Sequence, residues 1–154
     1  MVSTIVNFFH LLATVTWIGG MIYGYFVLTP SLAAIDPPQR GRLMGATAIR
    51  FSKLAWGSVI VLLITGFLRT PPGMLFSPSS TYGVTLLVKH LAVLAMIVIG
   101  LVITFSVAPR MESLAPGPGE KPSPGFFQVQ KRLELLALVN VILGLIVLLL
   151  AASF

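Results

Sequence analysis

Four long apolar runs are the feature of this chain that most constrains its fold. Each run has the ~20 residues that a helix needs to cross a hydrocarbon core about 30 Å thick. We predict membrane spans at about residues 3–29, 51–70, 82–108 and 129–153. Of the 154 residues, 56% are hydrophobic and only 9% are charged, against about 25% charged in a typical soluble domain. The sequence therefore predicts an all-α, integral membrane four-helix bundle that forms a single transmembrane domain over residues 1–154.

Proline and glycine mark the expected ends of the spans. Pro30 and Pro109 should end the first and third spans, because proline lacks a backbone donor and restricts the residue before it. From Leu43 onward Gly45 is the one helix breaker before the second span, so that helix should begin early and project beyond the bilayer. Residues 115–125 are rich in proline and glycine and lack apolar periodicity, which predicts a flexible loop.

Basic residues gather on one side of the predicted bundle. Eight Lys and Arg side chains surround the first and third loops, whereas Arg69 stands alone in the opposite loop. Because Lys and Arg in short loops favour the cytoplasmic side, we expect both termini on the outer, periplasmic side of a bacterial inner (cytoplasmic) membrane, crossed in several passes. The lipid bilayer is then the main partner. The net charge of +6 does not indicate nucleic acid, because no basic helix or aromatic platform accompanies it, and a homo-oligomer stays open.

The two histidines of the chain fall at one depth. The helical rise places His10 roughly 10 Å, and His90 roughly 12 Å, from the outer ends of the first and third spans. An ionisable group in the hydrocarbon is expensive and by default faces the bundle interior. Two neutral imidazoles across a bundle suit the axial positions of a haem iron. We therefore predict His10 and His90 as metal ligands of haem b held between helices 1 and 3, with copper as the alternative.

Four more residues complete this predicted cofactor site. Gly66 would leave room for a macrocycle, and Arg69 would either pair with a haem propionate or anchor the helix at the interface. Thr14, one turn from His10, would line the site or simply hydrogen-bond the histidine. Trp17 would form the floor of the pocket or belong to the apolar core.

Lys89 is a further candidate in the third span. It lies about 100° around the helix axis from His90, so only one of the two can face the first helix. If Lys89 faces inward, it would ligate the iron as a neutral amine or pair with a propionate. The alternative is that the long aliphatic side chain extends through the apolar region and places its ammonium group at the membrane interface.

Because cysteine is absent, the side chains that would suit copper are those of histidine and methionine. Met21 lies on nearly the same face as His10 but about 16 Å further along the axis. Met96 is turned some 120° from His90. The sequence therefore predicts no tight cluster of histidine and methionine within the bilayer.

Three short stretches resemble a known family. They are "HLLATVTWIGG" in the first span, "TGF" late in the second and "YGVTLLVKHLAVL" in the third. Over about residues 5–110 the chain resembles the copper-resistance D (CopD-like) membrane proteins, and it is similar to the related bacterial J-type protoporphyrinogen oxidase family. The resemblance implies a small helical bundle that handles copper, or that binds b-type haem and oxidises porphyrins. It also implies His10 and Lys89 as the functional pair.

Three functions follow from these observations. The first is a b-type haem-binding protein with an electron-transfer or oxidoreductase role, served by a redox partner or a quinone. If it is an enzyme, it would be a haem-dependent membrane oxidoreductase like protoporphyrinogen oxidase. The second is a copper-transport or copper-resistance membrane protein. The third is a cofactor-free structural subunit of a membrane complex.

Overall fold

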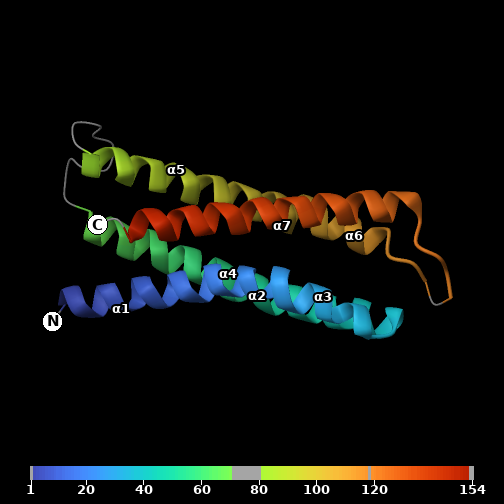
Figure 1. The fold of residues 1–154 in the computed structure, drawn as a ribbon. Helices are drawn as coiled ribbons and strands as arrows, with labels where there is room; N and C mark the ends of the chain where they lie inside the picture. Colours follow the sequence, from blue (N-terminus) through green and yellow to red (C-terminus); the bar gives the residue numbers. More distant parts are fainter. Residues whose placement is uncertain (1, 71–80, 118, 153–154) are drawn as a thin grey trace.

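The computed structural model describes residues 2–70, 81–117 and 119–152, and every regular element within these ranges is a helix. Four of the helical stretches are long and apolar enough to cross a membrane, which confirms the all-α, four-helix prediction. They run alternately up and down, so that the first begins and the last ends at the same end of the bundle (Figure 1). The four candidate spans are Ser3–Ala34, Gln39–Arg69, Thr81–Ser113 and Pro124–Ala151.

The first and third spans are composite helices. Short π-helical segments, in which the hydrogen bonds reach one residue further than in an α-helix, interrupt both of them. The second and fourth spans are continuous, and α4 begins even earlier than the predicted early start. The elements are, in chain order, α1 Val2–Thr14, η1 Val15–Gly19, α2 Gly20–Tyr23, η2 Gly24–Leu28, α3 Thr29–Ser31, η3 Leu32–Ala34, α4 Pro37–Arg69, α5 Thr81–Val102, η4 Ile103–Val107, α6 Ala108–Ser113 and α7 Pro124–Ala151.

The prediction that two prolines end the first and third spans is wrong, since both helices continue past them. Pro30 follows the π-helical segment η2, and Pro109 follows η4. The carbonyl with which each proline ring would clash, four residues earlier, lies inside the wider π turn. Near Pro30, the hydroxyl of Ser31 also donates to the carbonyl of Val27 over 2.6 Å. The wider π turn before each proline therefore lets the helix continue past it.

One apolar core joins all four spans. Helix α1 packs mainly against α4, and α5 packs mainly against α7, so the bundle consists of two antiparallel pairs. Between the two pairs, the residues at the centre of the bundle are buried and pack against one another. This buried cluster consists of Trp17 and Ile18 from the first span, Val59 from the second, Ala92 and Met96 from the third, and Val147 from the fourth.

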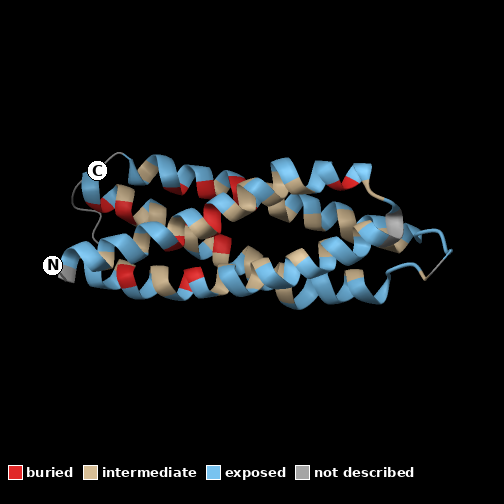
Figure 2. Cartoon of the chain, turned by 90° about the horizontal axis from the view of Figure 1, so that it is seen from below, coloured by how far each residue is buried: buried red, intermediate tan, exposed pale blue. Residues whose placement is uncertain are grey.

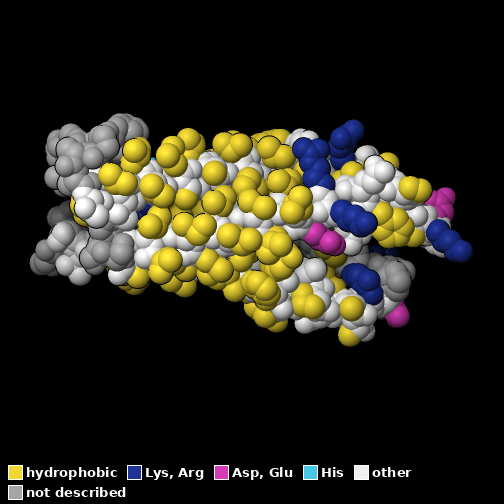
Figure 3. Space-filling model, turned by 45° about the horizontal axis from the view of Figure 1, so that its top comes forward, with side chains coloured by type: hydrophobic (Ala, Val, Ile, Leu, Met, Phe, Trp, Pro, Cys, Tyr) yellow, Lys and Arg dark blue, Asp and Glu magenta, His cyan; other side chains and the backbone are white. Residues whose placement is uncertain are grey.

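The outward faces of the helices are apolar and exposed. Phe105 and Leu149, for example, have exposed fractions of 74% and 72%. Figure 2 shows the buried positions turned toward neighbouring helices, and exposed positions along the outside. On the face shown in Figure 3, hydrophobic side chains cover the length of the spans, and charged side chains gather at the end opposite the N-terminus. This distribution is that of a multi-pass membrane protein, with lipid against the apolar belt.

Candidate functional site

The His10 side chain connects α1 to α4. Its Nδ1 lies 2.7 Å from Oγ1 of Thr65, which is itself buried, with 6% of its surface exposed. The Thr65 hydroxyl donates its proton to the carbonyl of Val61 over 2.6 Å. A hydroxyl has one proton, so Oγ1 of Thr65 must accept from Nδ1–H of His10. This bond fixes the tautomer of the imidazole and leaves the lone pair on Nε2.

Thr65 is a site residue that the sequence reasoning missed. The hydroxyl of Thr14, the expected partner, instead donates to the backbone carbonyl of His10 over 2.8 Å. A hydroxyl does bond to the His10 ring, but it belongs to Thr65 of the neighbouring helix α4 and not to Thr14. A signal was available, because Thr65 immediately precedes Gly66 in the "TGF" stretch. At Gly66 a β-carbon would lie 3.8 Å from Cε1 of His10, an ordinary contact, so the imidazole packs over this glycine.

Two cations act electrostatically on His10. The charges of Arg69 and Lys89 both act on the imidazole, and the charge of Arg69 also acts on Lys89. Lys89 is half-buried on α5, and its charge reaches His10. Of the other predicted site residues, Gly66 therefore packs against His10, and Arg69 and Lys89 act on it through their charges.

His90 is half-buried on α5, next to Lys89. The close packing in the bundle joins α1 to α4 and α5 to α7, and the His10 ring is bonded across the first of these interfaces. None of these contacts joins His10 to His90. The binding of haem between helices 1 and 3 by these two histidines therefore stays a prediction. Among the described residues there is also no group of three or more His, Asp or Glu side chains that could hold a metal ion.

Trp17 lies in the apolar core, with 5% of its surface exposed. It packs with Val59, Met96 and their neighbours in the cluster that joins the four spans. This position agrees with the core alternative for Trp17.

Two methionine side chains converge on Gly144 at the centre of the bundle. A β-carbon on Gly144 of α7 would lie 3.5 Å from Cε of Met21 and 3.5 Å from Cε of Met96. Met96 is fully buried and Met21 is half-buried. The sequence reasoning compared each methionine only with a histidine of its own span and so missed this pair. The available signal was a glycine in the fourth span, because a small residue lets side chains of neighbouring helices converge on it.

A buried amide lies one helical turn before this methionine pair. Asn140 has 6% of its surface exposed and precedes Gly144 by four residues, on the same face of α7. Within the described part of the chain, its Oδ1 atom has no hydrogen-bond partner. A polar group inside a membrane bundle is expensive unless it is satisfied or functional. This amide therefore lies one turn along α7 from the glycine on which the two methionines converge.

The family comparison agrees with this architecture. The model of the family described as copper resistance protein D matches residues 45–154, from within α4 to the end of the chain. The match includes Arg69, Lys89, His90 and the fourth span, but it begins after the first span, which carries His10. No curated protein and no solved structure matches the chain significantly.

The match supports the copper alternative and not the haem prediction. The resemblance seen in the sequence covered about residues 5–110, and the match extends it to the fourth span. It does not test the likeness to the protoporphyrinogen oxidases. Since it covers far more than half of the 154 residues, the chain belongs to the copper resistance protein D family.

Proposed function

We propose that this protein binds Cu(I) inside its four-helix bundle and passes it across the membrane. The observation that carries the proposal is the hydrogen bond between His10 and Thr65, because it presents Nε2 of His10 as a ligand atom. Histidines that ligate metals typically donate their other ring N–H to a neighbouring oxygen, as His10 does. The family of the chain supports copper as the metal.

The methionine pair supplies a second position for the same ion. Cu(I) is a soft cation that prefers thioether, thiolate and imidazole ligands. The chain has no cysteine, so soft ligands must come from methionine and histidine. Met21 and Met96 offer two thioethers at the centre of the bundle, where the cost of burying a cation is greatest. We propose that copper moves between His10 and this pair, with His90 as an additional ligand at the level of His10.

The distribution of charges supports one orientation of the protein in the membrane. We propose that both termini face the periplasm and that the basic end of the bundle faces the cytoplasm. In support, eight of the ten Lys and Arg residues belong to the first and third loops and the helix ends beside them. His10 would then lie toward the periplasmic side, and the methionine pair would lie deeper.

A competition titration tests the proposal. The detergent-purified protein is kept reduced and titrated with Cu(I) in the presence of a chromophoric Cu(I) chelator. We expect the wild type to withdraw copper from the chelator, His10→Gln to lose one class of site, and Met21→Leu with Met96→Leu to lose the other. Met111→Leu is the matched control, since Met111 lies in α6 at the far end of the bundle and should leave the titration unchanged.

Two outcomes would count against copper transport. One is a wild-type protein that removes no Cu(I) from the chelator. The other is a purified protein that carries stoichiometric haem with a Soret band, lost in His10→Gln, which would favour the haem prediction instead. In cells, deletion should cause copper sensitivity, and His10→Gln should fail to restore resistance while Met111→Leu restores it.

A further inference from the structure

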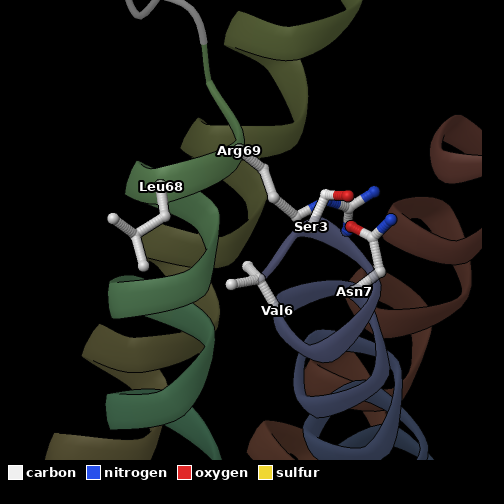
Figure 4. Close-up of a pocket in the computed structure, with 5 residues that line it drawn as sticks. All are labelled: Ser3, Val6, Asn7, Leu68 and Arg69. Atoms are coloured by element: carbon white, nitrogen blue, oxygen red, sulfur yellow. The ribbon is translucent and has the colours of Figure 1, made fainter. Parts of the chain in front are cut away.

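A cavity lies between the beginning of the first span and the end of the second. Its volume is about 440 Å³, and it is lined by Ser3, Val6, Asn7, Leu68 and Arg69. Figure 4 shows the Arg69 side chain reaching from the end of α4 toward Ser3 and Asn7 on α1. One wall therefore carries a guanidinium, a hydroxyl and an amide, whereas Val6 and Leu68 make the remainder apolar.

The charge of Arg69 has no intramolecular counterion in the described part of the chain. No hydrogen bond or ion pair of Arg69 is found among residues 2–70, 81–117 and 119–152. The four acidic residues of the whole sequence also lie far from it, either in the loops or in the helix portions at the opposite end of the bundle. They are Asp36, Glu112, Glu120 and Glu134. Among the described residues, therefore, no side chain supplies a negative charge at this cavity.

Three features of the cavity favour an anion. The planar guanidinium of Arg69 can donate two parallel hydrogen bonds to a phosphate or a carboxylate. The side chains of Ser3 and Asn7 add neutral donors. Helix α1 begins at Val2, so the unpaired N–H groups and the positive dipole end of a 13-residue helix also lie at this wall.

The apolar part of the lining identifies the kind of anion. The cavity is open and lies at the end of two candidate membrane spans, a position that a bilayer about 30 Å thick would bring near its headgroups. Leu68, 64% exposed, extends its apolar wall toward the lipid. A free inorganic anion gains nothing from Val6 and Leu68, and a zwitterionic headgroup brings a cation of its own. We infer that this cavity binds the phosphate of an anionic phospholipid, with an acyl chain along the apolar wall.

Thermal unfolding of the copper-free protein in a neutral detergent tests this inference independently of copper transport. Phosphatidylglycerol, phosphatidylcholine and inorganic phosphate are added separately at equal phosphate concentration. A ligand that binds only the folded state raises the melting temperature. We expect phosphatidylglycerol to raise it, and the other two to raise it much less. Arg69→Gln should raise the half-saturating phosphatidylglycerol concentration at least about tenfold, as expected when a charge-assisted hydrogen bond is lost.

Matched variants separate a built site from general charge effects. Arg42→Gln removes the same charge from an exposed position of α4 at the other end of the bundle, and it should leave the response unchanged. Arg69→Lys keeps the charge but not the bidentate fork, so it should restore the response only in part. An equal response of Arg69→Gln and wild type, or an equal loss in Arg42→Gln, would overturn the inference. A full response to inorganic phosphate alone would also overturn it, by showing a free-anion site.

Discussion

Nδ1 of His10 donates a hydrogen bond to Oγ1 of Thr65 over 2.7 Å, while the Thr65 hydroxyl donates in turn to the carbonyl of Val61. This chain of two bonds joins the first span to the second and orients one ring of the proposed copper route. It also assigns different tasks to the two ring nitrogens, because Nδ1 is held by the protein and Nε2 carries the lone pair. The first prediction follows from this division.

Replacing Thr65 with valine should weaken copper binding without unfolding the protein. Valine has nearly the shape of threonine but cannot accept from Nδ1–H, so the imidazole loses its fixed tautomer and orientation. Loss of such a supporting partner typically costs about 10- to 100-fold in metal affinity. The chelator competition titration measures the change at the His10 site.

Thr14→Val is the control for this prediction. The Thr14 hydroxyl also donates to a backbone carbonyl four residues earlier, yet it does not touch the imidazole. Its variant should keep the copper affinity of the wild type. If Thr65→Val binds Cu(I) as tightly as Thr14→Val, the tautomer argument fails, even if His10 is a ligand.

Removing the charge of Arg69 should strengthen copper binding at His10. The guanidinium acts electrostatically on this imidazole, and a cation at Nε2 would be repelled by it. In lipid-free detergent, we expect Arg69→Gln to raise the Cu(I) affinity about three- to tenfold, a modest share of the repulsion between two charges at the edge of a membrane protein. Competition titrations at low and high salt check this, because the gain should shrink as the salt concentration rises.

A neutralising substitution elsewhere provides the comparison. Arg42→Gln makes the same change in net charge, and the residue lies near the start of α4, far from His10. An equal gain in both variants would mean that total charge matters and the position of Arg69 does not.

The membrane architecture could be predicted from the sequence because it depends on local properties. Apolar runs of sufficient length and few charges specify spans wherever the chain is in contact with lipid. The path of the chain at Pro30 could not be predicted in the same way. It depends on whether the helix can widen into a π-helical turn just before the proline, as it does at η2.

The site was only partly predictable, because pairing between helices is not a local property. The depth of His10 follows from the helical rise, and this residue does lie among other predicted site residues. Its partner Thr65 depends on the rotation of α4 about its own axis, which no apolar pattern specifies when the outside of the helix is as apolar as the inside. The convergence of Met21 and Met96 depends similarly on Gly144, in a third helix.

Replacing Asn140 with leucine should lower copper transport without lowering the stability of the protein. The Oδ1 atom of Asn140 is buried and has no hydrogen-bond partner in the described residues, a situation that costs about 1–3 kcal/mol. Leucine removes this cost with a side chain of similar size, so the melting temperature in detergent should stay the same or rise. If the amide assists copper between the methionine pair and the basic end, uptake of Cu(I) into proteoliposomes should fall severalfold.

The prediction holds if the uptake of Cu(I) falls while the melting temperature stays the same or rises. Uptake equal to that of the wild type would leave Asn140 without a part in transport. A strong loss of stability would instead show that the amide holds the helices together.

Replacing Gly144 with leucine should damage both the packing and the methionine pair. A β-carbon there would already lie 3.2 Å from Cγ2 of Ile18, closer than an ordinary contact, and the rest of a leucine side chain would occupy the space between Met21 and Met96. Overpacking of this kind costs about 1–3 kcal/mol. We expect a lower melting temperature and loss of the Cu(I) site that depends on the two thioethers. Gly57→Leu is the matched control, because nothing lies within 4 Å of a β-carbon at Gly57, so this variant should change the free energy of unfolding by less than about 0.5 kcal/mol. If Gly144→Leu binds as much Cu(I) as Gly57→Leu, the two methionines do not share an ion, and copper binding must depend on the histidine end of the bundle alone.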